Sequence, residues 1–113
     1  MHELSLAMEV ISLAEKEAGK KNLTLISEIL IEVGELSGVE ADAFQWGLEM
    51  LAKESVLANA EIKINRIPGR GRCTSCNIGF EMKTRLGMCP ECNGFPSVIT
   101  AGEEFRVVSL LAE

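Results

Sequence analysis

The first residues of the chain carry the donor atoms of a compact metal chelate. His2 is the only histidine in a sequence of 113 residues, and it directly follows Met1. The α-amine of Met1, the backbone nitrogen of His2 and its imidazole can close around one metal ion as fused chelate rings. Three coplanar nitrogens suit Ni(II) or Cu(II), which favour square-planar sites of nitrogen and oxygen. Glu3 comes next and is a candidate either to supply the fourth ligand or to orient the site.

Both side chains also have a plainer interpretation. Terminal residues are usually poorly ordered, so His2 could be an exposed histidine on a frayed end without a role. An acidic residue such as Glu3 also favours the first turn of a helix, where it opposes the helix dipole. The rest of the sequence has to decide between these interpretations and a metal site.

Four cysteines gather in one stretch with the pattern C-x2-C-x12-C-x2-C: Cys73, Cys76, Cys89 and Cys92. Two such pairs on a short hairpin can converge on one tetrahedral ion, and the glycines that follow are expected to take the positive φ of the turns. We expect structural zinc, because four thiolates leave no open position for catalysis. Two disulfides or a redox-active iron site are the alternatives. The sequence shows no secretion signal, and the reducing conditions of a cytoplasmic protein favour a metal over disulfides.

The element behind the candidate chelate is a helix expected from Leu4 to Ala18. The residues that recur at helical spacing and indicate its buried face are Leu4, Met8, Ile11 and Ala14 or Glu15, with Ala7 and Ala18 on the same broad face. Gly19 is expected to end the helix, since glycine is favoured just after a helix C-terminus. Residues 1–3 would then form a short leader held against the folded domain.

The remaining pattern predicts an α+β fold, with a small mixed sheet of about three strands, two helices and an inserted zinc-ribbon-like module. Phe44, Leu48 and Leu51 should line the buried face of the second helix, and Trp46 is expected to pack as well. Pro68-Gly69 and Gly102 punctuate the chain on either side of the cysteines. The expected elements are a strand in 23–33, a helix in 41–53, a strand in 62–67 and a strand in 105–111.

Composition and charge exclude several classes of protein. A hydrophobic content of 47% with 25% charged residues indicates a globular chain, and no apolar run is long enough to span a bilayer. The net charge of −6 argues against a nucleic-acid binder. Basic residues cluster around the first cysteine pair, where they either balance thiolate charge or form a docking patch for an acidic partner: Arg66, Arg70, Arg72, Lys83 and Arg85.

Three motifs occur together in the order Met1-His2-Glu3, Val33-Gly34-Glu35-Leu36-Ser37-Gly38-Val39-Glu40, and the two cysteine pairs with Cys89-Pro90. In this combination the chain resembles the HypA/HybF family of hydrogenase maturation factors, which are nickel metallochaperones. The resemblance covers essentially the whole sequence. It implies a nickel-binding domain of residues 1–68 and 98–113, and a zinc-binding domain of residues 69–97.

The resemblance also implies the roles of particular residues and partners. The amine of Met1 and His2 would bind nickel, Glu3 belongs to the same motif, and Glu40 lies where the family places an acidic residue near the nickel. The four cysteines would hold structural Zn(II). A GTPase partner would help to load Ni(II), which is delivered to the hydrogenase large-subunit precursor and, in some relatives, serves urease maturation. Certain relatives use a further histidine near the zinc, and His2 is alone in this chain.

Three other classes of protein fit the sequence less well. A zinc ribbon for nucleic acid conflicts with the negative charge and with the lack of aromatics among the arginines. A rubredoxin-like electron carrier is suggested by Cys89-Pro90-Glu91-Cys92, and it would contain iron. An enzyme would need a catalytic set or an open metal site, and we expect no catalytic residues. Monomer and homodimer both remain open, and a cytoplasmic protein without membrane contact is expected.

Overall fold

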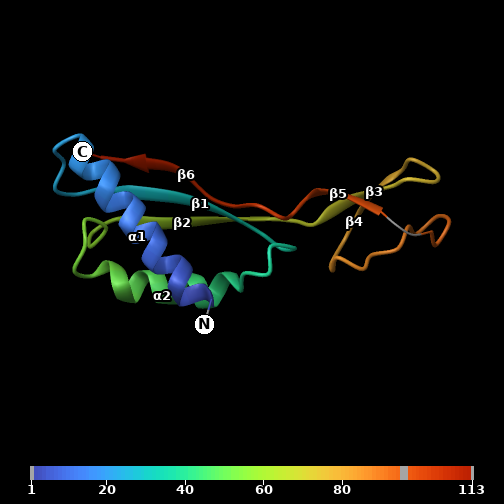
Figure 1. Cartoon of the computed structure of the whole chain (residues 1–113), viewed down its shortest axis with the longest axis horizontal. Helices are drawn as coiled ribbons and strands as arrows, with labels where there is room; N and C mark the ends of the chain where they lie inside the picture. The colour runs from blue at the N-terminus through green and yellow to red at the C-terminus, as the bar shows by residue number, and fades with distance from the viewer. Residues whose placement is uncertain (1, 95–96, 113) are drawn as a thin grey trace.

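The computed structural model describes residues 2–94 and 97–112, and within them the chain forms two three-stranded sheets that lie end to end (Figure 1). The strand order is β2-β1-β6 in one sheet and β4-β3-β5 in the other. The molecule is elongated, with extents of 54 × 26 × 17 Å. Neither of the described helices is long and apolar enough to cross a membrane. The elements are α1 (His2–Lys20), β1 (Glu28–Gly34), α2 (Ala41–Ala52), β2 (Glu61–Ile67), β3 (Arg70–Cys73), β4 (Gly79–Glu81), β5 (Ser97–Ala101) and β6 (Phe105–Leu111).

The first sheet is mixed and carries both helices, which confirms the expected α+β class. β1 pairs in parallel with β2 and antiparallel with β6. Side chains alternate along a strand, so β1 puts Ile29, Ile31 and Val33 into one core. Phe44 and Leu48 of α2 are fully buried in the same core, together with the inner face of α1.

Helix α1 begins at His2, so the expected leader is wrong for residues 2 and 3. Glu3 lies in the first turn, where a carboxylate is favourable to the helix dipole. Its side chain also accepts the N–H of Glu40 just before α2, and this contact holds the first turn in place.

The C-terminus of α1 lies beyond Gly19, which was expected to end it. Asn22 takes the left-handed conformation at φ 56° instead. The N–H of Leu23 donates to the carbonyl of Ala18, and the N–H of Asn22 donates to that of Gly19. These two bonds form a Schellman ending, a motif in which asparagine can replace glycine.

The buried face of α1 is built from small residues, and the expected face is right for Ala7, Ala14 and Ala18 but wrong for Leu4 and Met8. Leu4 and Met8 are 46% and 60% exposed. Leu4 instead touches the surface of α2 above Gly47. Small side chains allow close helix packing but give a weak hydrophobic pattern. The residues of α1 that are buried are Ala7, Val10, Ala14 and Ala18.

Helix α2 spans nearly the expected range, but two of its large side chains are not buried. Leu51 is 38% exposed and Trp46 is 66% exposed, so the expectation that Trp46 packs is wrong. Trp46 is two residues from both Phe44 and Leu48, and a step of two residues leads to the opposite side of a helix.

The strand pattern also differs from expectation in two places. The strand expected within 23–33 is β1 at Glu28–Gly34, because the preceding residues form a loop that buries Ile26. The zinc-ribbon-like module contains a third strand, β5, which pairs antiparallel with β3 and which the sequence did not indicate.

Glycines allow the two sheets to meet closely. A Cβ at Gly34, the last residue of β1, would lie 2.0 Å from the carbonyl oxygen of Gly102, which follows β5. Leu36 lies between β1 and α2 in sequence, but its side chain is buried in the second sheet's core. The other buried members of that core are Cys73, Phe80, Met82 and Cys89.

Candidate metal centres

His2, Glu3 and Glu40 meet where the two helices begin. The Nδ1 atom of His2 lies 3.8 Å from Oε2 of Glu3, and the same oxygen accepts the N–H of Glu40 at 3.1 Å. The side chain of His2 is 60% exposed, whereas that of Glu3 is 13% exposed. Three of the four residues expected at a nickel site are therefore neighbours, and Met1 lies outside the described residues.

Glu40 takes part in this arrangement through its backbone, a contribution that the sequence analysis missed. Its Oε1 accepts the N–H of Asp42 at 3.2 Å, so its side chain serves as the N-cap of α2. Asp42 in turn pairs with Arg66 on β2. No local pattern could have revealed the N–H of Glu40 as the donor to Glu3, because the two residues are 37 positions apart.

The hydrogen bonds around Glu3 favour its ionised form. The hydrogen bond from the N–H of Glu40 to the carboxylate is the main reason that the pKa of Glu3 lies below its ordinary value of 4.5. The hydrogen bond from the N–H of Glu3 itself is the next largest cause. The charge on His2 lowers the pKa further by a smaller amount. A carboxylate held in this form offers an oxygen ligand to a divalent cation.

A helix that begins at His2 leaves its backbone nitrogen outside the helical hydrogen-bond ladder, since the first four N–H groups of an α-helix have no acceptor within it. Nδ1 is the imidazole nitrogen that can share a small chelate ring with this backbone nitrogen. Adjacent ligands on bonds of about 2.0 Å lie about 2.8 Å apart, so Nδ1 and the Glu3 carboxylate would need to approach by about 1 Å. The arrangement can thus assemble nitrogen and oxygen donors on one ion.

The four cysteines converge at the far end of the second sheet: Cys73, Cys76, Cys89 and Cys92. All four sulfurs lie within 4.8 Å of one another, and two of their separations are 3.5 Å. A tetrahedral zinc ion with bonds of about 2.3 Å places its sulfurs about 3.8 Å apart. All four are free thiols, and the separations exceed the roughly 2.05 Å of a disulfide. The donor set fits a structural zinc site.

Backbone N–H groups prepare this cluster to hold negative charge. The N–H groups of Cys76 and Ser75 both approach the sulfur of Cys73 at 3.4 Å, and they lower the pKa of its thiol to about 6. The pKa of Cys76 is raised, chiefly by its hydrogen bond with Cys89. The pKa of Cys92 is also raised, chiefly by its hydrogen bond with Cys73. A divalent cation would relieve this competition, because it stabilises all four thiolates together.

The turn after each cysteine pair is formed by asparagine and not by the expected glycine. Asn77 and Asn93 take φ values of 64° and 56°. Their N–H groups donate to the carbonyls of Cys73 and Cys89 at 2.9 and 2.8 Å. Asparagine tolerates the left-handed region better than most residues, so it supplies the turn that the sequence analysis assigned to glycine.

Comparison with known proteins gives one consistent result along the whole chain. Residues 1–112 match the profile of the family described as "HypA: Hydrogenase/urease nickel incorporation, metallochaperone, hypA". A hydrogenase maturation factor HypA of Geobacter metallireducens is 36% identical over 113 residues, which cover all of both chains. A HypA of Parabacteroides distasonis is 35% identical over 111 residues, or 98% of this chain and 96% of that protein.

Solved structures agree with the sequence matches. The solution structure of the Ni metallochaperone HypA from Helicobacter pylori aligns with a TM-score of 0.65 at 30% identity and covers 98% of both chains. A second HypA solution structure aligns with a TM-score of 0.70 at 28% identity, over 100% of this chain and 97% of that one.

Proposed function

The chain belongs to the HypA family of metallochaperones for hydrogenase and urease nickel incorporation, and from this premise we propose that it binds Ni(II) at its N-terminus and delivers it to a [NiFe]-hydrogenase large-subunit precursor. The observation that carries the proposal is the contact of His2 with Glu3 at the exposed start of α1. The protein acts as a carrier and not as a catalyst.

The proposed nickel ligands are the amine of Met1, the backbone nitrogen of His2 and its Nδ1. Glu3 either supplies the fourth ligand or orients the imidazole. Glu40 acts in the outer shell, because its side chain caps α2 while its N–H holds Glu3. The square plane of nitrogen and oxygen donors suits Ni(II), although affinity alone would favour Cu(II). Choice of nickel in the cell then depends on metal supply and on the partner that docks.

Release of the ion follows from where these ligands lie. His2 is at the very start of α1 and is largely exposed, so the metal lies at the surface and not in a closed cage. A protein partner can approach it and exchange ligands one at a time. Binding requires a deprotonated amine and a neutral imidazole, so nickel affinity should fall as the pH is lowered.

Zinc has a different role in the proposal. Cys73, Cys76, Cys89 and Cys92 hold Zn(II) as a structural ion, since four sulfur ligands leave no open position.

We propose that nickel binding and delivery take place in the cytoplasm, where thiols stay reduced. The proposed partners are a nickel-loading GTPase and the hydrogenase precursor, and urease maturation proteins are a further candidate. The proposed nickel-binding unit is residues 1–68 and 98–113, and the proposed zinc-binding unit is residues 69–97, to whose strand β3 the strand β5 adds its pairing.

The test is a calorimetric Ni(II) titration of tag-free, zinc-loaded protein. The unchanged chain should bind one ion tightly, and His2→Ala should lose that site while its melting temperature stays the same, because His2 is exposed. Acetylation of the α-amine should remove the site as well. Glu3→Gln removes the carboxylate that is proposed to supply the fourth ligand or to orient the imidazole. Glu9→Gln makes the same change on the exposed side of the same helix and is its matched control. Equal binding by the wild type and His2→Ala would reject the proposal.

Transfer is tested separately with purified hydrogenase large-subunit precursor and radiolabelled nickel. Nickel should move from the loaded protein to the precursor faster than it escapes to a chelator in solution. A precursor that gains nickel no faster than from free Ni(II) would contradict delivery while leaving the binding site intact.

A further inference from the structure

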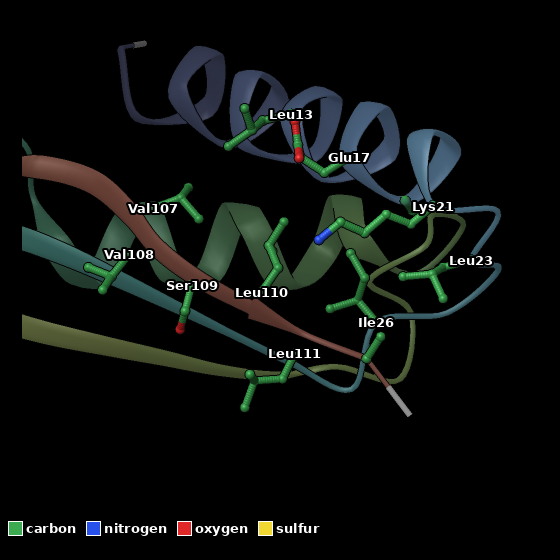
Figure 2. A pocket seen from close by; sticks show the side chains of 12 residues that line it. Leu13, Glu17, Lys21, Leu23, Ile26, Val107, Val108, Ser109, Leu110 and Leu111 are labelled. Carbon is green, nitrogen blue, oxygen red and sulfur yellow. The ribbon is translucent and has the colours of Figure 1, made fainter.

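Charge distinguishes two surfaces that take no part in the candidate metal sites. One is an apolar groove between the C-terminal half of α1 and β6, where Figure 2 shows the side chains of Glu17 and Lys21 among apolar ones. These opposite charges favour no particular occupant. The other is the outer face of the second sheet, which carries two unpaired arginines. A surface with one sign of charge selects a partner of the opposite sign.

Arg70 and Arg72 lie two residues apart on β3, the central strand of the second sheet. Residues at this spacing point to the same side of a strand, and both are exposed while the residues that alternate with them are buried. Neither guanidinium forms an ion pair with a described residue, whereas Arg66 and Arg85 of the same basic cluster are paired with acids. Two positive charges on the outer face are therefore available to a partner.

Gly79 of β4 leaves a gap beside these two arginines. It is the cross-strand partner of Arg72, and it has no side chain that could cover the outer face. A Cβ added to Gly79 would lie 3.8 Å from the carbonyl oxygen of Gly71 and 3.9 Å from Nη2 of Arg70, which are ordinary contact distances. An acidic side chain in the gap above Gly79 can reach both guanidiniums and form charge-assisted hydrogen bonds with them.

The free edge of β4 exposes the backbone groups with which an extended segment would pair. The N–H of Cys73 donates to the carbonyl of Ile78. Bonded pairs alternate along antiparallel strands, so the next bonded pair is Gly71 with Phe80. The N–H and C=O of Gly79, between these pairs, then point away from β3 toward the free edge. The opposite edge of the sheet, β5, has a register shift against β3, and such irregularities discourage a further strand.

We propose that the second sheet binds an extended segment of a partner protein at β4, with an acidic side chain of that segment in the gap above Gly79 between Arg70 and Arg72. The segment adds a strand to the free edge of β4, a common mode of peptide recognition. Glu81 lies two residues further along β4 on the same face, so the segment has a neutral or basic side chain opposite it. This docking role goes beyond nickel binding and is independent of it.

Nucleic acid fits this face less well than an acidic protein segment does. Two unpaired arginines neutralise few phosphates, and the whole chain has a net charge of −6. Single-stranded nucleic acid also stacks its bases on aromatic side chains. Phe80 is the one aromatic residue in the described strands β3, β4 and β5, and it is buried on the other face.

The test is an NMR titration of tag-free, zinc-loaded, isotope-labelled protein with a short peptide of alternating threonine and valine. One central threonine of the peptide is replaced by glutamate. The amide signals of Gly79 and Glu81 and the guanidinium signals of Arg70 and Arg72 should shift. The same peptide with glutamine in place of glutamate should bind about tenfold more weakly, because it cannot form the charge-assisted hydrogen bonds.

Variants of the protein locate the contact. Arg70→Gln and Arg72→Gln should each weaken binding of the glutamate peptide about tenfold. Lys83→Gln makes the same charge change at a side chain that lines a separate hollow near Glu40, and it should bind as the wild type does. Gly79→Glu puts a carboxylate of the protein itself into the gap, so the peptide should lose its site while the amide spectrum stays dispersed. Nickel titrations of all these variants should match the wild type, which separates this proposal from nickel binding.

Equal binding of the glutamate and glutamine peptides would overturn the proposal, as would wild-type affinity in both arginine variants. Single-stranded oligothymidylate is the competing probe. If it binds more tightly than the peptide and depends on the same arginines, the face belongs to nucleic acid and the proposal is wrong.

Discussion

The carboxylate of Glu3 and the backbone N–H of Glu40 are joined by a hydrogen bond of 3.1 Å that ties the start of α1 to the start of α2. Since Glu3 also lies beside His2, this bond sets where the imidazole can go. The two helices are packed together near the same end, with Leu4 above Gly47. His2 and Glu3 therefore lie on the first turn of a packed helix.

The bond between Glu3 and Glu40 predicts a dependence of stability on pH. The pKa of Glu3 is lowered from 4.5 mainly by the Glu40 N–H, so its contribution is complete above pH 4.5 and is lost as the pH falls through the lowered folded value. In Glu3→Gln the side chain cannot ionise. The difference in unfolding free energy between the wild type and Glu3→Gln should therefore shrink below pH 4.5.

Urea unfolding of both proteins at a series of pH values measures this difference. The contribution of the zinc site to the unfolding free energy cancels, because both proteins contain it. Glu9→Gln serves as the control on the same helix. A difference that stays constant from neutral to acid pH would show that the charge on Glu3 does not matter to the fold.

The close approach of the two sheets predicts that Gly34→Ala is strongly destabilising. The added Cβ would meet the carbonyl oxygen of Gly102 at 2.0 Å, and backbone cannot move aside as a flexible side chain can. Overpacking of this kind costs about 1–3 kcal/mol or more. In contrast, a Cβ added at Gly19, which lies inside α1, would meet nothing within 4 Å. Gly19→Ala should therefore stabilise the folded protein by about 0.5–1 kcal/mol. Chemical unfolding of the two variants beside the wild type should give shifts of opposite sign.

The loop between β1 and α2 leads to a prediction for Leu36. Its side chain is 4% exposed and belongs to the core of the second sheet, while its N–H donates to the carbonyl of Gly102 at 2.7 Å. Leu36→Ala should cost about 2–5 kcal/mol through lost burial and a cavity. Leu25→Ala, at a side chain that is 49% exposed, should cost much less. Similar losses for the two variants in thermal unfolding would contradict the role of Leu36 as a core residue.

The parts of the fold that sequence predicted are those with a strong local pattern. The alternation of apolar and polar residues predicted β2, the richness in Val and Leu predicted β6, and the spacing of Phe44 and Leu48 predicted α2. The buried face of α1 was predicted only in part: Ala7 and Ala14 are buried as expected, but Leu4 is exposed although its side chain carries a strong hydrophobic signal. Short strands such as β3 and β4 alternate in burial, but their sequences RGRC and GFE are rich in glycine and charge and too short to show this in a hydrophobic pattern.

The candidate sites were likewise predicted only where a local pattern exists. The cysteine spacing predicted a cluster, because two C-x2-C pairs are typical of one tetrahedral metal site. The pairing of His2 with Glu3 was also visible as neighbours in the chain. The role of the Glu40 N–H was not visible, since it depends on how α1 and α2 pack. Contacts made by backbone atoms across a tertiary interface leave no trace in residue types.

The separation of the two cores predicts how the protein responds to loss of zinc. Cys89 is fully buried in the second core with Met82 and Phe80, whereas the first core contains no cysteine among the described residues. Structural zinc in small modules contributes about 10–16 kcal/mol, which is comparable to the whole stability of a domain. Cys89→Ser, or removal of zinc by a chelator, should unfold the second sheet and leave α1, α2 and the first sheet folded. Amide NMR spectra should lose the dispersed signals of residues 70–101 and keep those of β1, and added zinc should restore the chelated wild type but not the variant. Simultaneous loss of both sets of signals would mean that the two sheets fold as one unit.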